Sequence, residues 1–358
     1  MKMKKVFFTV GPSQTYPTVQ KHLKDGIKNN ILSISHRDDL FHEFFFENVS
    51  LLKKLLKIPL DYHVFFISSG TEGMELSINN CVMEKSFHLT TGAFGDKFFN
   101  IAKDLGKNPD KLSFIDNKKL KNLNLSKYEL LCVTENDTST GISFPMDQVY
   151  EIKKRNKNLL IAVDSVSSVP FGDLEYEYLD LVFFSVQKGL GLPAGLGIIV
   201  VSPKAIDKAN KLLKLKKDIG SYHNLPTLLS YAKKGETPET PNVLSIYLLN
   251  RVLKDMLIFG VDRIRKETLE KAKIIYEFLE NNSSFKPLIK DLHIRSQTTI
   301  VATTKKKSKD VVTSLKKRGI FIGSGYGVNK DKHIRIGNFP AHTLEDVKRL
   351  ITALAEFI

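Results

Sequence analysis

Short apolar runs rich in β-branched and aromatic residues recur through the first part of the chain and alternate with longer amphipathic stretches. Five of these runs predict strands buried on both faces, over residues 63–68, 129–133, 159–163, 181–186 and 197–201. The spacing of apolar positions between them predicts helices over 72–85, 94–105 and 146–156. Buried strands that alternate with helices are typical of a mainly parallel sheet covered by helices. The sequence therefore predicts an α/β domain.

The pattern changes after about residue 240. Long amphipathic helices are predicted over 244–258 and 261–279. A shorter series follows, with strands over 298–302, 319–322 and 333–336 and helices over 308–317 and 344–357. We therefore expect a large domain over 1–245, and a linking helix with a smaller C-terminal α+β domain over 246–358. Whether the N-terminal segment packs on the small domain is left open.

The composition is that of an ordinary globular protein, since 42% of the 358 residues are hydrophobic and 26% are charged. These proportions exclude disordered, collagen-like and coiled-coil chains. Lys and Arg outnumber Asp and Glu by 54 to 39, which gives a formal net charge of +15. Such an excess suits a nucleic-acid partner, an anionic membrane or an acidic small substrate, and the charge alone does not choose among them.

Neither cysteine stands in a pattern typical of a metal site or a disulfide framework. Cys81 and Cys132 lie in apolar sequence, without a Cys or His at ligand spacing. The apolar run 6–10 is too short for the core of an export signal, and no stretch approaches the roughly 18 apolar residues of a membrane span. We therefore expect a cytoplasmic protein with no metal and no membrane partner.

Lys188 is the first candidate for chemistry. It follows the predicted strand 181–186, and a loop rich in Gly and Pro separates it from the next strand. A lysine sheltered by apolar neighbours has a lowered pKa, and its free amine attacks carbonyl groups, as a Schiff-base lysine does. Taken alone, Lys188 is more simply a solvated loop residue.

Asp164 ends the predicted strand that precedes the strand of Lys188. The carboxyl ends of parallel strands are where α/β proteins bind ligands, although an Asp before a Ser also commonly caps a turn or helix. The pair is more specific than either residue. A strand-end Asp and a strand-end Lys are what pyridoxal phosphate requires, namely an amine for its aldehyde and an anion that keeps its pyridine nitrogen protonated.

Two further segments suit the same cofactor. Residues 68–73, SSGTEG, join a strand to a helix, and a helix N-terminus offers free N–H groups and the positive end of its dipole to a phosphate. Phe94 stands between glycines at the start of another predicted helix, where its ring can stack on a planar group. Taken alone, a tight turn and core packing explain these segments better than a ligand does. The glycine-rich segment 323–327 precedes a predicted strand, and we interpret it as a flexible turn.

Nine motifs are spread over nearly the whole chain: GPSQTYP (11–17), ISHRDDLF (34–41), SSGTEGMEL (68–76), TGAFG (91–95), ENDTSTGISFP (135–145), AVDSVSS (162–168), SVQKGLGLPAG (185–195), ETPNVLSIY (239–247) and HIRIGNF (333–339). In this order they resemble the class V pyridoxal-phosphate aminotransferases, and most of all the phosphoserine aminotransferase branch. The most specific is QK followed by GLPAG. The resemblance implies the type I fold of pyridoxal-phosphate transferases, pyridoxal phosphate as cofactor and a homodimer with shared active sites.

The resemblance also assigns catalytic roles. Lys188 would bind the cofactor covalently and then move the proton of the substrate α-carbon. Asp164 would pair with the pyridinium nitrogen, and Phe94 would stack on the ring where the family usually has a tryptophan. Thr138 would bond the phenolic oxygen of the cofactor.

Further residues match binding positions of the family. Gly70, Thr71 and Gln187 match the cradle for the cofactor phosphate, and Thr240 matches a threonine donated to that cradle by the neighbouring subunit. Arg335 matches the arginine that holds the substrate α-carboxylate, for which a planar bidentate donor is suited.

The sequence departs from the phosphoserine branch in three places. An Ala-Arg pair is replaced in the segment 70–72, a His-Arg pair is replaced at 328–329, and Glu239 replaces an asparagine. These changes remove cations expected at phosphate groups. His36 and Arg37 are retained and would hold a substrate phosphate, although such a pair is common throughout class V.

The sequence therefore predicts an aminotransferase that moves an amino group between a small amino acid, foremost phosphoserine, and a 2-oxo acid such as 2-oxoglutarate. An alanine- or serine-glyoxylate type transaminase is the alternative within the same fold, favoured by the missing cations. A basic nucleic-acid-binding protein would explain the charge but leaves Asp164 and Lys188 without a purpose. We accordingly expect no nucleic-acid partner.

Overall fold

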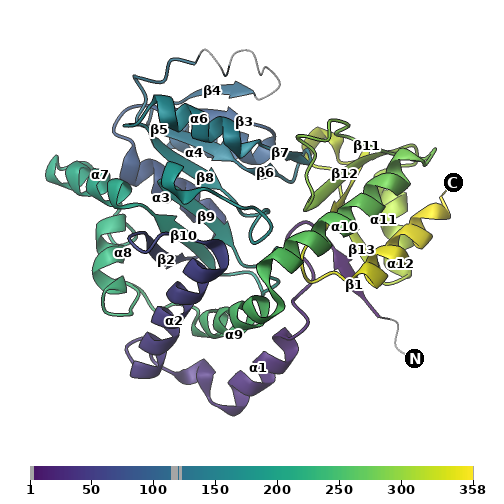
Figure 1. Ribbon diagram of the computed structural model, residues 1–358, viewed down its shortest axis with the longest axis horizontal. Coiled ribbons are helices and arrows are strands. Elements are labelled where there is room, and N and C mark those ends of the chain that lie inside the picture. The colour runs from purple at the N-terminus through teal and green to yellow at the C-terminus, as the bar shows by residue number, and fades with distance from the viewer. Residues whose placement is uncertain (1–3, 114–119, 121–122, 358) are drawn as a thin grey trace.

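The structure is a computed structural model, and it describes residues 4–113, 120 and 123–357. Two sheets divide the chain into two lobes, the larger at the left of Figure 1 and the smaller at the right. The helices α9 (Val243–Phe259) and α10 (Val261–Glu280) follow one another along the molecule and connect the lobes.

The large sheet has seven strands, in the spatial order β2 (His63–Ile67), β10 (Gly197–Val201), β9 (Leu181–Ser185), β8 (Leu160–Asp164), β5 (Leu130–Thr134), β3 (Ser86–Thr90) and β4 (Asp110–Ser113). Among these strands β10 alone runs against the others. A short loop without a helix joins β9 to β10, and such a connection returns the chain antiparallel. The predicted α/β fold with a mainly parallel sheet is confirmed, and the strands β3 and β4 are additions to it.

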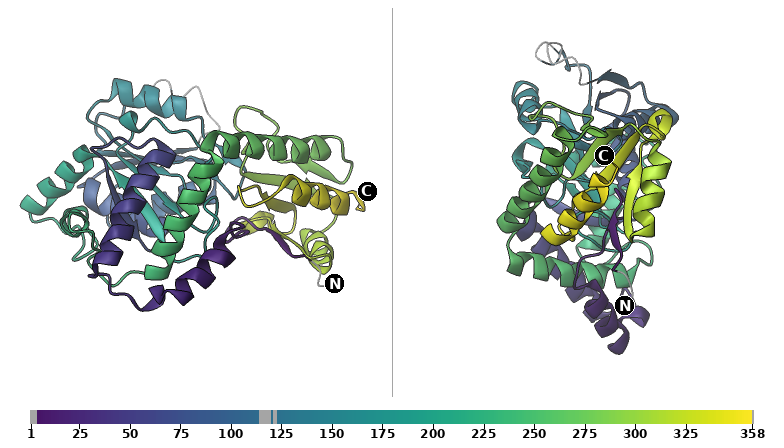
Figure 2. Two further views of the ribbon diagram at one scale, coloured as in Figure 1. Left: turned by 60° about the horizontal axis from the view of Figure 1, so that its bottom comes forward. Right: turned by 90° about the vertical axis from the view of Figure 1, so that its right-hand side faces the viewer.

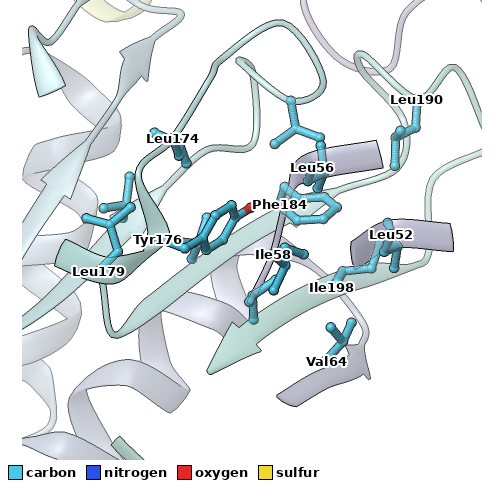
Figure 3. Packing of buried hydrophobic residues seen from close by; sticks show 14 of the residues in the cluster. Leu52, Leu56, Ile58, Val64, Leu174, Tyr176, Leu179, Phe184, Leu190 and Ile198 are labelled. Carbon is cyan, nitrogen blue, oxygen red and sulfur yellow. The ribbon is translucent and has the colours of Figure 1, made fainter. Parts of the chain in front are cut away.

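Successive residues of the large sheet point to opposite faces, and both faces are buried. One face packs against α2 (Asp39–Leu56), α6 (Met146–Arg155) and α9. In Figure 3, Phe184 and Ile198 lie on this face near Leu52 and Leu56 of α2. The other face packs against α3 (Gly70–Cys81), α4 (Ala93–Asp104), α7 (Pro203–Lys214) and α8 (Leu225–Ala232).

The small sheet has five strands, in the order β1 (Val6–Phe8), β13 (Ile320–Ser324), β14 (His333–Gly337), β12 (Thr299–Thr304) and β11 (Phe285–Pro287). Its core is completed by α10, α11 (Ser308–Lys317) and α12 (Leu344–Ala355). The N-terminal segment, whose packing the sequence left open, forms the edge strand β1, which pairs with β13 in parallel. Figure 2 shows this segment running from the small lobe to α1 (Val19–Lys28), beside the large one.

The two long helices belong to different cores. Ile246 and Leu253 of α9 are buried in the core of the large sheet, whereas Ala272 and Ile275 of α10 are buried in the core of the small sheet. Gly260 separates the two helices with a φ of 93°, a conformation that glycine adopts without strain. Ile264, in the start of α10, still packs in the core of the large sheet, so the packing of the chain changes within α10, between Ile264 and Ala272. The domain division 1–245 and 246–358 stays a prediction.

Candidate active site

A cavity of about 320 Å³ lies at the carboxyl edge of the large sheet, where Tyr326 and Arg335 of the small lobe meet the loops that follow the strands. This is the edge at which α/β proteins place their ligands. The cavity brings together eight of the predicted site residues: Gly70, Thr71, Phe94, Thr138, Asp164, Gln187, Lys188 and Arg335.

Lys188 follows β9 and is 7% exposed. Two positions close to Lys188 have no room for a side chain and are occupied by glycines. A Cβ on Gly11 would lie 2.7 Å from Cε of Lys188, and a Cβ on Gly189 would lie 1.9 Å from the carbonyl oxygen of Val169. The Lys188 ammonium lies 5.5 Å from the centre of the Phe94 ring. It forms no hydrogen bond or ion pair with the residues that the structure describes.

Burial lowers the pKa of Lys188 to about 8, although the negative charge of Asp164 acts in the opposite direction. A lysine with such a pKa is partly uncharged near neutral pH. Its amine is therefore available to attack a carbonyl group and to take up a proton afterwards.

Asp164 is the last residue of β8 and is buried. One of its oxygens, Oδ1, accepts a hydrogen bond of 3.0 Å from the backbone N–H of Val166. Burial raises the pKa of Asp164 to about 6, while that hydrogen bond and the charge of Lys188 lower it. A buried carboxylate of this kind is stabilised by a cation brought into the cavity.

An aromatic wall closes one side of the cavity. Asp137 accepts hydrogen bonds from the N–H groups of Phe94 and Gly95, at 3.0 and 3.2 Å, and so fixes the start of α4. The Phe94 ring lies 5.8 Å, between centroids, from the ring of Tyr326. The sequence interpretation missed Tyr326, because it treated the segment 323–327 as a flexible turn. An aromatic residue between glycines, which drew attention to Phe94, was the available indication.

Arg335 projects from β14 into the same cavity. Its Nε donates to the carbonyl oxygen of Ser324 at 2.7 Å, and Nη1 donates to that of Thr138 at 3.3 Å. Its guanidinium carbon lies 5.4 Å from the centre of the Tyr326 ring. These contacts hold the guanidinium at the junction of the two lobes, where it can bind a carboxylate.

The start of α3 forms the opposite wall. The N–H of Gly70 donates to Ser185 Oγ at 2.7 Å, and a Cβ on Gly70 would lie 2.3 Å from Val166 Cγ2. Lys97 of α4 donates to the hydroxyl of Thr71 at 2.9 Å. The side-chain oxygen of Gln187 is buried without a partner among the described residues, so its amide is available to a ligand. A helix N-terminus, an available amide, a free amine and a buried carboxylate together fit pyridoxal phosphate.

Three predicted residues lie outside this cavity. Arg37 forms an ion pair with Glu236, and its guanidinium carbon lies 5.7 Å from the Tyr231 ring centre. His36 contacts the edge of the Phe41 ring. Thr240 lines a second cavity beside the start of α3. Their roles stay predictions, because within one chain these residues do not reach Lys188.

Among the residues that the structure describes, no group of three or more His, Cys, Asp or Glu is placed to hold a metal ion. Among the same residues, no helix is both long and apolar enough to cross a membrane.

A mainly parallel sheet with a buried strand-end lysine facing a buried strand-end aspartate is the arrangement of a pyridoxal-phosphate-dependent enzyme. The family model "Aminotransferase class-V" matches residues 6–350, and the chain belongs to that family. It is thus an aminotransferase whose cofactor is pyridoxal phosphate.

Individual relatives agree with this assignment. The chain is similar to a crystal structure of a phosphoserine aminotransferase from Cytophaga hutchinsonii, with 41% identity, a TM-score of 0.95 and 99% of each chain covered. A phosphoserine aminotransferase of Leuconostoc mesenteroides is 28% identical, over 97% of this chain and 96% of its own. An alanine-glyoxylate aminotransferase from Nostoc shares the fold, with 22% identity, a TM-score of 0.86 and coverage of 98% and 94%.

Proposed function

We propose that the protein transfers the amino group between phosphoserine and a 2-oxo acid such as 2-oxoglutarate. The observation that carries this proposal is the meeting of Lys188, Asp164 and Arg335 in one cavity. The similarity to phosphoserine aminotransferases over nearly the full chain supports the choice of amino acid.

The residues of the cavity divide the work. When bound, pyridoxal phosphate supplies an electron sink for the negative charge that develops at the substrate α-carbon. Nζ of Lys188 would hold the cofactor and later carry the proton removed from the α-carbon. The carboxylate of Asp164 would keep a proton on the ring nitrogen. Arg335 would bind the α-carboxylate, and the rings of Phe94 and Tyr326 would exclude water from one side.

We infer that the active unit is a homodimer. Thr240, His36 and Arg37 carry predicted binding roles but lie away from Lys188 within one chain, so a second copy is the natural source of these groups. Sedimentation is expected to show a dimer. A stable monomer with full cofactor occupancy would contradict the inference.

A cytoplasmic setting is supported by the free, buried cysteines Cys81 and Cys132.

One observation favours the alternative, an alanine- or serine-glyoxylate type transaminase. Arg37, the expected phosphate ligand, is already engaged by Glu236. If that pairing persists in the dimer, the substrate side chain meets no free cation from this residue, and a small uncharged side chain fits better.

The variant Arg37→Ala separates the two substrates. If the substrate phosphate is bound by Arg37, the change removes a charge-assisted hydrogen bond of about 1.5–3 kcal/mol, or roughly 10- to 150-fold in kcat/KM, for phosphoserine and hardly affects alanine. The measurement is an amino-donor screen with phosphoserine, serine and alanine. The control Tyr231→Phe leaves both charges of the Arg37–Glu236 pair in place. Equal losses on phosphoserine and alanine would make us abandon the phosphoserine assignment.

A further inference from the structure

A second cavity, of about 290 Å³, lies beside the start of α3, and three charged side chains line it. Glu72 stands in the first turn of α3, and Glu239 directly precedes Thr240. His223 lies between the two carboxylates. We call these three residues the His223 cluster. Both glutamates stand at positions where the sequence departs from the phosphoserine branch.

With both glutamates ionised, the geometry of the cluster favours a charged imidazole. Nδ1 of His223 faces Oε1 of Glu72, and Nε2 lies 2.8 Å from Oε2 of Glu239. A neutral imidazole has one N–H, so its other nitrogen would present a lone pair to a carboxylate oxygen. Only the imidazolium donates to both glutamates. Burial lowers the pKa of His223, but the hydrogen bonds to Glu239 and Glu72 outweigh it and raise that pKa to about 9.

The imidazole joins three segments of the chain. Glu72 is held in turn by Ser68, whose N–H and hydroxyl both donate to Oε2 at 2.6 Å. On the other side, the hydroxyl of Thr237 donates to the carbonyl oxygen of Glu239 at 2.7 Å, which shapes the segment 236–242. His223 itself directly precedes Asn224, the N-cap of α8. The start of α3 and the segment of Thr240 are therefore linked through one side chain.

The cluster also decides the charge beside the expected phosphate cradle. Helix α3 offers its N-terminus, but Glu72 places a carboxylate in the first turn, where it would repel an anion. With an imidazolium the three side chains carry a net charge of −1, and with a neutral imidazole they carry −2. The titratable groups that face the imidazole are Glu72 of α3, Glu239 of the segment 236–242 and the neighbouring Tyr222, whose ring centroid lies 4.5 Å away.

We propose that His223 is a positioning residue for the cofactor phosphate. Its imidazolium neutralises Glu72 beside this chain's own cradle, and it holds the segment of Thr240, which the resemblance assigns to the partner subunit's cradle, against the start of α3. The proposal rests on the proposed function, since it takes this end of α3 as the site of the phosphate. The proposal gives Glu72 and Glu239, which stand where the sequence departs from the phosphoserine branch, one common partner in His223.

The test compares His223→Gln with the matched control His22→Gln, which alters a half-buried His–Asp pair with Asp255, outside the His223 cluster. The dissociation constant of pyridoxal phosphate is measured on apoprotein prepared from the holoenzyme, between pH 7 and pH 10.5. We expect His223→Gln to weaken binding about tenfold at pH 7. The dissociation constant of the variant, divided by that of wild type, should fall to about one above pH 9. There the His223 imidazolium of the wild-type protein loses its proton and the two proteins carry the same charge. His22→Gln should match wild type throughout.

A rescue and a direct titration complete the test. Adding Glu72→Gln to His223→Gln should recover most of the lost affinity, because no unpaired carboxylate then remains at the cradle. In the wild-type protein, an NMR titration of His223 should have its midpoint near pH 9, and this measurement remains valid if a variant fails to fold.

Two results would overturn the proposal without touching the proposed function: equal cofactor affinity of His223→Gln and wild type across the pH range, or a His223 midpoint below pH 7. A wild-type protein that binds no pyridoxal phosphate would overturn both.

Discussion

A buried lysine and a buried aspartate lie at each end of the strands β8 and β9. The two side chains form an ion pair at one end and do not at the other. At the amino end, Lys153 of α6 donates to Asp180 at 2.7 Å and to the carbonyl oxygen of Leu159 at 2.6 Å. Asp180 also accepts from Ser202 Oγ at 2.9 Å. At the carboxyl end, Lys188 and Asp164 face one cavity, and Nζ of Lys188 makes no hydrogen bond to any described residue.

The difference shows that burial alone does not make a residue reactive. The amino-end pair satisfies its own charges and fixes helix α6 to the sheet, so breaking it leaves an unpaired buried charge. The carboxyl-end pair leaves its charges incompletely satisfied, which shifts both pKa values toward neutrality and creates a demand for a ligand. The same two residue types therefore serve stability at one edge and chemistry at the other.

The two lysines should separate these roles most sharply. Lys188→Ala should abolish transamination, a loss of at least about a thousandfold, and borohydride should no longer trap the cofactor on the protein. Lys153→Ala should instead lower the free energy of unfolding by roughly 3–5 kcal/mol, with near-normal turnover of the folded fraction. Denaturant titration, activity assays and mass spectrometry of the trapped peptide provide the measurements. Trapping at a lysine other than Lys188 would reject its assignment.

The two aspartates should repeat the contrast at a smaller scale. Asp164→Asn removes the anion that keeps the ring nitrogen protonated. We expect a loss of about 3–5 kcal/mol of transition-state stabilisation, which lowers kcat/KM by roughly two to four orders of magnitude. Stability should change little. Asp180→Asn should destabilise the protein and spare turnover. Near-wild-type turnover of Asp164→Asn would reduce Asp164 to a structural cap.

Arg335 tests the part of the carboxyl edge that the small lobe contributes. Arg335→Lys keeps the charge but loses the planar fork, so KM should rise roughly 10- to 100-fold for every amino-acid substrate. Steady-state kinetics on phosphoserine and alanine check this. A loss confined to phosphoserine would mean that Arg335 binds the phosphate instead of the shared α-carboxylate.

The smallest effect is a pH dependence of the apoprotein. The pKa of Lys188 is lowered to about 8 in the folded protein, whereas a lysine in the unfolded chain has its ordinary pKa near 10.4. Between about pH 8 and pH 10.4 the folded protein therefore binds fewer protons than the unfolded chain. Stability should therefore rise with pH through this window. We expect the Tm difference between wild type and Lys188→Ala to move by about 2–4 °C in favour of wild type from pH 7.5 to 10. An unchanged difference would mean that Lys188 is solvated.

Much of the fold followed from the apolar runs, and the exceptions have physical causes. Strand β3 escaped prediction because it buries polar residues, with Ser86 Oγ and His88 Nε2 satisfying each other at 2.9 Å. Strand β4 is an edge strand of sequence DKLS and has no apolar run. The reversed direction of β10 was also beyond the pattern, because the alternation of side chains is the same in either direction.

The candidate site was predictable where a residue stands at or just beyond the carboxyl end of a buried strand, as Asp164 and Lys188 do. Tyr326 was not, because its place in the cavity arises only when the small lobe meets the large one. Arg335 and Thr138 were found through resemblance alone, since their meeting depends on a hydrogen bond between distant segments. The ion pair of Arg37 with Glu236 likewise leaves no trace in local sequence.

Strand β1 has a consequence for how the molecule is made. Val6 pairs with Ile320, so β1 waits during synthesis for a strand that lies far later in the chain. The segment after β1 leads to Gly11, which packs on the side chain of Lys188. The large sheet can form on the ribosome while this segment is still unanchored. The wall beside Lys188 is therefore completed only when the small sheet closes, which makes a working site depend on the synthesis of β13.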